Sequence, residues 1–131
     1  MLLCQDKQGN KHRIYFDMTR SQSGAFINEQ EILNTQEFKA PFDNKLARCA
    51  TYAKIEQVRI DGENRILQIL ISQKGHYKLQ YFWLICEFTG KHTNVIICDE
   101  SFVVLEALRH IPLSKAWREV RVGKVLQPLP Q

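Results

Sequence analysis

Between residues 51 and 105, apolar side chains recur at every second position, and short glycine-bearing turns interrupt them. A period of two is that of a β-strand, whereas a helix would repeat every 3.6 residues or so. The turns near Gly62, Gly75 and Gly90 separate the apolar segments by only a few residues. Connections this short join antiparallel strands. We therefore predict a run of consecutive antiparallel strands over this part of the chain.

The first 50 residues predict a smaller set of elements. Residues 1–17 have the pattern of a hairpin with its turn at Gly9 and Asn10, and residues 24–27 that of a further short strand. Pro41 suits the first position of a helix. The apolar residues after it have helical spacing and end near Ala50: Phe42, Leu46 and Cys49. The predicted fold class is mainly β, of the α+β type: an antiparallel meander or sandwich with one short helix.

Length and composition predict one globular domain over residues 1–131. A chain of this size buries enough surface for a real core, and 44% hydrophobic and 24% charged residues are ordinary values. No apolar run approaches the roughly 20 residues that span a bilayer, so we expect no membrane partner. The first residues become polar too soon for a signal peptide, which predicts a cytoplasmic location.

Catalysis and metal binding find little support in the motifs. The four cysteines, at positions 4, 49, 86 and 98, form no CxxC pair and lie in or beside apolar segments, which is typical of reduced, buried thiols rather than zinc ligands. None of the four histidines, at positions 12, 76, 92 and 110, combines with a cysteine or serine in a known catalytic motif. We expect no enzyme activity, no metal and no cofactor.

The charge distribution permits a polyanionic partner. The formal net charge is +4, and the last 31 residues hold five basic residues against two acidic ones. Most of the excess therefore lies at the C-terminal end, in a segment that Pro112, Gly123, Pro128 and Pro130 make too irregular for regular structure. A balance this mild allows nucleic-acid binding without requiring it.

The stretch CEFTGKHTNVIICDE, residues 86–100, places a polar, glycine-bearing connection between two apolar segments. One interpretation is a simple hairpin turn, with Asn94 bonding its own backbone. The other is a binding patch, in which Lys91 meets a phosphate and His92 stacks or hydrogen-bonds. Arg65, after the turn at Asp61 and Gly62, has the same two interpretations: an exposed turn residue, or a contact to phosphate or base.

Four segments together resemble one protein family. The first is the stretch just quoted, which resembles a strand followed by E-x-x-G-[RK]-[HG]-[ST]-N and a second apolar strand. The others are KAPFDNKLARC, IEQVRIDGENRILQI and ALRHIPLSKAWREVRVGKVLQPLP. This combination resembles the N-terminal domain of the NFACT proteins, and the resemblance covers nearly the whole chain. The family often has Asp-Arg where this sequence has Asn64-Arg65, so an acidic role at this position does not carry over, whereas Arg65 matches.

The resemblance implies a fold similar to the N-terminal domain of formamidopyrimidine-type DNA glycosylases, without their catalytic residues. It also implies a binding role in ribosome-associated quality control, with tRNA and the large ribosomal subunit as partners and support for the tailing of stalled chains. Bacterial members carry the alternative label of fibronectin- or fibrinogen-binding proteins, which would imply a cell-surface adhesin. The family's other modules are absent, so the sequence resembles a truncated domain of a larger protein.

The nucleic-acid-binding patch that we predict has two origins. The resemblance implies that the family's tRNA-contacting positions correspond to Asn64, Arg65, Glu87, Phe88 and Thr89. The charge argument adds Lys91 and His92. A hairpin whose first strand leaves Arg65 and whose second returns to Glu87 brings these two residues together. We therefore expect Glu87 to lie close to Arg65 and to pair with it.

Overall fold

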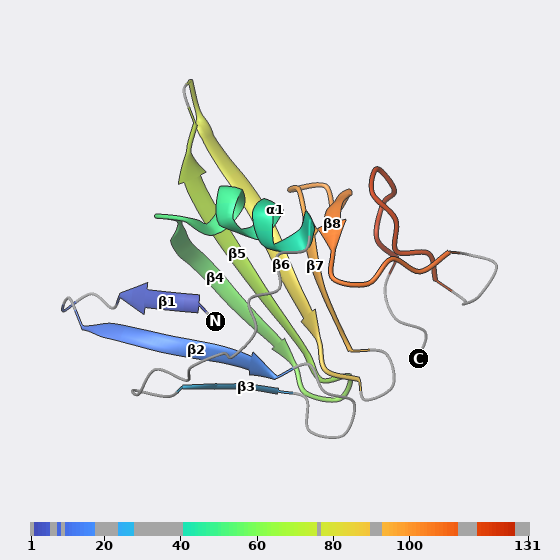
Figure 1. The fold of residues 1–131 in the computed structure, drawn as a ribbon, viewed down its shortest axis with the longest axis horizontal. Coiled ribbons are helices and arrows are strands. Elements are labelled where there is room, and N and C mark those ends of the chain that lie inside the picture. The colour runs from blue at the N-terminus through green and yellow to red at the C-terminus, as the bar shows by residue number, and fades with distance from the viewer. Residues whose placement is uncertain are drawn as a thin grey trace.

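The computed structural model describes residues 2–5, 8, 10–17, 24–27, 41–75, 77–89, 93–112 and 118–127. Figure 1 shows two antiparallel sheets and one helix. The smaller sheet has three strands in the order β1 (Leu2–Gln5), β2 (Lys11–Asp17) and β3 (Gly24–Ile27). The predicted N-terminal hairpin and the following short strand are therefore confirmed.

The larger sheet is a five-stranded meander in which every strand pairs with its neighbours in sequence. Its strands are β4 (Lys54–Asp61), β5 (Ile66–Lys74), β6 (Leu79–Glu87), β7 (Asn94–Cys98) and β8 (Val104–Ala107). The turns near Gly62 and Gly75 lie where the glycines predicted them. A side chain at Gly75 would place its Cβ 2.9 Å from the Lys78 carbonyl oxygen, so the tight β5–β6 turn needs glycine there. Gly90 lies outside the described residues. The predicted mainly-β fold with one short helix is confirmed.

The helix α1 (Pro41–Ala50) covers one face of the larger sheet (Figure 1). Asp43 lies in its first turn and Arg48 in its last, where each charge is favourable to the helix dipole. Phe42 and Cys49 are buried on its inner side. They pack with Leu46 against alternate residues of three strands: Ile69, Ile71, Leu84 and Ile97. Within the described ranges, no helix has the length and apolarity to cross a bilayer.

The opposite face of the sheet carries a second apolar cluster, which the C-terminal segment helps to close. Its sheet residues include Trp83, Ile85, Ile96 and Cys98, and Val120 joins them from the C-terminal side with no exposed surface. Two isolated bridges fix this segment: Val103 to Val125 and Ile111 to Val120. The segment is irregular, as predicted, and yet it forms part of the core.

Strand β4 differs from its neighbours because all eight of its residues are exposed. Its pairing with β5 shifts between Ile55 and Gln57, which is a bulge at Glu56. The Glu56 carboxylate accepts a hydrogen bond of 2.7 Å from the buried Ser72 hydroxyl. The bulge interrupts the alternation of apolar side chains between Ile55 and Val58.

Three described cysteines, Cys49, Cys86 and Cys98, are free and buried. Cys86 pairs with Val95 across the ladder, whereas Cys98 pairs with Trp83. Their positions three residue pairs apart have opposite parity, so the two side chains lie on opposite faces of the sheet. Adjacent strands therefore do not bring these two thiols together. Cys4 has no described side chain, and the reduced state of all four cysteines stays a prediction.

We expect Ile97→Ala to lower the free energy of unfolding by about 2–5 kcal/mol, because Ile97 has no exposed surface and its removal leaves a cavity under α1. Ile60→Ala is the matched control, since Ile60 is 77% exposed on β4, and it should cost less than about 1 kcal/mol. Urea denaturation measures both values. Equal effects of the two substitutions would contradict the assignment of Ile97 to the core.

Burial raises the pKa of both the Cys86 and the Cys98 thiols to about 12, from the model-compound value of 9.0. Because the thiolate is the reactive form, neither thiol should react with a thiol-specific reagent at pH 8 until the chain is unfolded by urea. The unfolded thiols ionise near pH 9, so the stability of the fold should fall as the pH rises from 9 towards 12. Rapid labelling of Cys86 in the native chain at pH 8 would contradict this burial.

Candidate functional site

The β4–β5 turn and the end of β6 meet at one edge of the larger sheet. Ile66 pairs with Glu87 across the ladder, and the Phe88 N–H donates a hydrogen bond of 2.9 Å to the Arg65 carbonyl oxygen. Two segments more than 20 positions apart in the sequence therefore form one surface. The predicted proximity of Arg65 and Glu87 is confirmed at the level of the backbone.

The side chain of Glu87 has a different partner from the one expected. Its carboxylate accepts hydrogen bonds from both terminal nitrogens of Arg118, at 2.5 Å from Nη2 to Oε1 and 2.8 Å from Nη1 to Oε2. Nη1 of Arg118 also donates to the Gln127 carbonyl oxygen at 3.2 Å. The interpretation that Glu87 pairs with Arg65 is therefore replaced by a two-pronged pair with Arg118.

This ion pair is buried. The Glu87 side chain is 3% exposed and that of Arg118 is 8% exposed. Moving two charges out of water is costly, so a buried pair is stable only when its geometry is good and its remaining polar atoms are bonded. The parallel N–H···O contacts and the Gln127 carbonyl meet that condition. The pair fixes the C-terminal segment, residues 118–127, against the end of β6.

The turn between β4 and β5 is fixed by its own polar residues. Asn64 donates to Asp61 twice, from its side-chain amide to Oδ2 at 2.8 Å and from its backbone N–H to Oδ1 at 3.3 Å. The side-chain bond from Asn64, followed by the backbone bond, lowers the pKa of Asp61, so this exposed carboxyl is ionised at neutral pH. Arg65 closes the turn with a φ of 55°, in the left-handed region that few non-glycine residues adopt.

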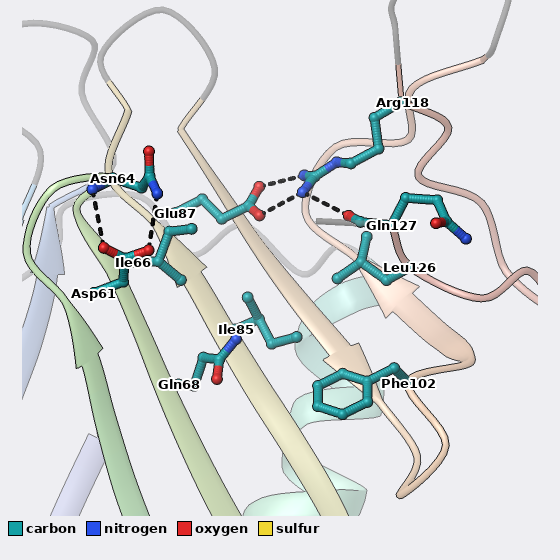
Figure 2. A pocket seen from close by; sticks show the side chains of 10 residues that line it. All are labelled: Asp61, Asn64, Ile66, Gln68, Ile85, Glu87, Phe102, Arg118, Leu126 and Gln127. Carbon is teal, nitrogen blue, oxygen red and sulfur yellow. Dashed lines mark hydrogen bonds and ion pairs between the residues drawn. The ribbon is translucent and has the colours of Figure 1, made fainter. Parts of the chain in front are cut away.

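An open pocket of about 320 Å³ lies between this turn, the sheet and the C-terminal segment (Figure 2). The ion pair closes one end of it, and the Asp61–Asn64 turn forms the other side. Its lining comprises Asp61, Asn64, Ile66, Gln68, Ile85, Glu87, Phe102, Arg118, Leu126 and Gln127. The pocket therefore combines an apolar floor with carboxamide and charged groups.

Phe102 has the second strained backbone at this pocket, with a φ of 62°. Asp99 holds the turn before it, because its carboxylate accepts hydrogen bonds from the Ser101 and Val103 N–H groups at 2.8 and 3.0 Å. The Phe102 ring stacks on Trp83, with centroids 5.5 Å apart and an interplanar angle of 16°. Strained residues of this kind persist only where the surroundings hold them firmly, and they are frequent at binding sites.

The predicted patch residues have different positions in this arrangement. Arg65 is exposed and Asn64 is half-buried in the turn, whereas Glu87 and Phe88 are buried. The Thr89 hydroxyl oxygen is buried and has no hydrogen-bond partner in the part of the chain that the structure describes. Lys91 and His92 lie outside the described residues. The structure thus brings together Asn64, Arg65, Glu87 and Phe88.

Of the residues that line the pocket, sequence reasoning predicted Asn64 and Glu87 and missed the others, including Arg118. Arg118 lies 31 positions after Glu87, in a segment without periodicity, so no local pattern pairs the two. Asp61, Gln68 and Phe102 carry no motif, although the parity of β5 and β6 puts Gln68 and Ile85 on the same face as Glu87.

Asn94 also has a role that the sequence did not predict. It begins β7 and is 1% exposed. Its side-chain amide donates to the Arg109 carbonyl oxygen, and its side-chain oxygen accepts from the Arg109 N–H, both at 2.9 Å. Asn94 therefore extends the sheet pairing through its side chain, and the idea that it bonds its own backbone in a turn is wrong. Among the described residues, no cluster of three or more acidic, histidine or cysteine side chains is arranged for a metal ion.

Comparisons with known proteins agree with this architecture. Residues 30–131 match the family model described as NFACT N-terminal and middle domains. A search of curated proteins found no significant match. The N-terminal part of the fibronectin/fibrinogen-binding protein of Streptococcus suis has 22% identity and a TM-score of 0.85, over 97% of this chain and 48% of that one.

Two further crystal structures share the fold. The N-terminal domain of the fibronectin-binding protein PavA from Streptococcus pneumoniae has 22% identity and a TM-score of 0.87, over 98% of this chain and 49% of that one. The fibrinogen-binding protein of Staphylococcus aureus has 19% identity and a TM-score of 0.79, over 98% and 44%. The chain spans about half the length of these structures, and identities this low show the fold alone.

We expect Arg118→Met to lower the free energy of unfolding by about 3–5 kcal/mol, because it leaves the Glu87 carboxylate buried without a partner. Arg121→Met is the matched control: its ion pair with Glu119 is 3.8 Å long and its side chain is 68% exposed, so the cost should be about 0–1 kcal/mol. The double variant Glu87→Leu/Arg118→Met should regain most of the lost stability. Thermal and urea unfolding measure all three, and a mild effect of Arg118→Met alone would contradict the importance of the buried pair.

Proposed function

The chain belongs to the family of NFACT N-terminal and middle domains, and on that premise we propose that it binds tRNA and the large ribosomal subunit. In this proposal it is a non-catalytic, cofactor-free, cytoplasmic binding domain of a ribosome-associated quality-control factor. That factor supports the tailing of stalled nascent chains.

The observation that carries the proposal is the meeting of the Arg65 turn and the end of β6 at one sheet edge. Exposed Arg65 lies there beside the half-buried Asn64 and the pocket. Guanidinium groups suit nucleic acids because they bind phosphate through two N–H groups and stack on bases. The buried Glu87 and Phe88 supply the rigid backing of this edge, since the Phe88 N–H holds the Arg65 carbonyl.

Binding to fibronectin or fibrinogen is the competing proposal, and its support is the names of the three proteins whose structures are similar. Salt dependence separates the two proposals. RNA binding through several phosphates should weaken steeply with salt, with a log–log slope of about −0.7 to −0.9 for each phosphate neutralised. A protein interface should respond much less. Titrations of tRNA, ribosomal subunits, fibronectin and fibrinogen at several salt concentrations decide between them.

We expect Arg65→Ala to weaken tRNA binding by about tenfold while the melting temperature stays nearly unchanged. The residue is exposed, and arginine and alanine share the steric cost of the left-handed backbone, so folding should tolerate the change. The lost bond to a charged group accounts for the weaker binding. Arg48→Ala, on the exposed side of α1, removes the same charge from the other face of the sheet and should have little effect.

Fluorescence anisotropy with labelled tRNA measures both variants. Equal binding by Arg65→Ala and the parent chain would remove Arg65 from the site. Unfolding of the variant would instead make Arg65 a structural residue. If both arginine variants lose affinity equally, the binding is a response to net charge and not to this edge.

A further inference from the structure

Strand β4 forms an open edge of the larger sheet. It comes first in the order of the strands, and among the described residues it pairs with β5 and with no other strand (Figure 1). All eight of its residues are exposed. An open edge presents unpaired N–H and C=O groups, and these groups are able to pair with a further strand.

Three apolar side chains of β4 lie on the α1 face of the sheet and remain largely in solvent. Ile55, Val58 and Ile60 are 43, 52 and 77% exposed. Their partners in the β4–β5 ladder all belong to the apolar cluster under α1: Ile71, Ile69 and Leu67. The apolar face of the sheet thus continues onto its open edge, which is typical of a surface where another chain binds.

The sequence of β4, KIEQVRID, is complementary to itself when it is read in the opposite direction. The bulge removes Glu56 from the regular alternation, so Val58 becomes the central residue of the strand. An antiparallel copy centred on Val58 gives four kinds of pair: Val58 with Val58, Ile55 with Ile60, Gln57 with Arg59, and Lys54 with Asp61. Opposite residues share a face of the sheet, so the apolar side chains of both copies meet on the α1 face.

The charges of β4 favour this register over its neighbours. Lys54 lies opposite Asp61, and the bulged Glu56 lies beside Gln57, opposite Arg59. A shift by one pair in one direction places Arg59 opposite Arg59 of the other copy. A shift in the other direction places Arg59 opposite Lys54. Opposite charges on adjacent strands stabilise their pairing and like charges destabilise it, so the charges select the register centred on Val58.

The charged side chains of β4 lie on the face away from α1. Arg59 pairs with Gln68 at the rim of the pocket, and its guanidinium carbon lies 5.0 Å from the centroid of the Trp83 ring. Asp61 lines the same pocket. The edge therefore carries an apolar pattern on one face and a charge pattern on the other. Both patterns match a second copy, and an arbitrary strand would have to match both to compete with it.

We propose that two copies of this chain pair through β4, antiparallel and centred on Val58, so that their larger sheets form one continuous sheet. The same residues of both copies form the contact, as in other two-fold symmetric dimers. The two-fold axis is perpendicular to the sheet, so both α1 helices lie on the same face. This inference does not rest on RNA binding, and association of the chain alone tests it.

The first test is sedimentation equilibrium of the full chain over a range of concentrations. The parent should approach twice the mass of a single chain as the concentration rises. Val58→Lys places two lysines opposite each other and should raise the dissociation constant of the pair by about tenfold or more. Val122→Lys is the matched control, because Val122 is 50% exposed and lies outside β4, and it should associate as the parent does.

Two further measurements test the register. Val58→Lys and Val58→Glu should each stay monomeric alone and should form a dimer when they are mixed, because a lysine then faces a glutamate. Val58→Cys should form a disulfide-linked dimer under copper–phenanthroline oxidation, above the background of the parent chain. Ile60→Cys should not, because two Ile60 positions lie about 13 Å apart along the paired strands at roughly 3.3 Å per residue.

Each contrary outcome overturns the inference. A parent chain that stays monomeric at the highest concentration reached has no such contact. If Val58→Lys also lowers the melting temperature of that monomer, another part of the same chain covers β4. Equal weakening by Val58→Lys and Val122→Lys would show a response to net charge. A dimer that Ile60→Cys links and Val58→Cys does not would pair through another register or another surface.

Discussion

The buried contact between Glu87 and Arg118 determines the shape of the candidate site. It joins the last residue of β6 to a segment that has almost no regular structure and whose described backbone bonds run to Phe102, Val104 and Ile111 rather than to β6. The two N–H···O bonds offset the cost of removing both charges from water, and the Gln127 carbonyl occupies a further N–H of the arginine. One wall of the pocket consists of this segment, and the pair fixes the position of that wall against the end of β6.

The same contact shows that some charged side chains stabilise the fold and are therefore not available to bind a ligand. Glu87 and Arg118 are almost inaccessible, so their charges act on each other. Arg59 and Arg65 are exposed at the pocket rim, so their charges are accessible from solvent. A net charge of +4 therefore says little about the site, because what matters is which basic residues remain accessible after the fold has used the others. The C-terminal excess of basic residues illustrates this, since Arg118 belongs to the interior.

Sequence reasoning succeeded where structure follows from local periodicity. The alternation in β6 places Trp83 and Ile85 in one cluster and Leu84 in the other, as the period of two requires. The spacing of Phe42 and Cys49 gave the buried side of α1 in the same way. Sequence reasoning failed where the interacting residue is distant in the sequence and lies in a segment without hydrophobic periodicity. The β5–β6 hairpin places Arg65 near Glu87, and this much follows from the sequence. Arg118 reaches Glu87 only through the path of the chain after β8, which no local pattern predicts.

The stretch from residue 86 to 100 contains both structural and binding residues, which explains why neither simple interpretation of it was sufficient. Glu87 and Asn94 lie opposite each other on β6 and β7, and each binds a residue of the chain beyond β8. These two polar side chains thus add to the backbone pairing that the irregular C-terminal chain makes with Phe102, Val104 and Ile111. Any effect of Glu87 on a ligand is therefore indirect, because its carboxylate is already occupied. Since the same strand end holds Arg65 through the Phe88 N–H, a loss of the ion pair alters both the pocket wall and the position of the exposed arginine.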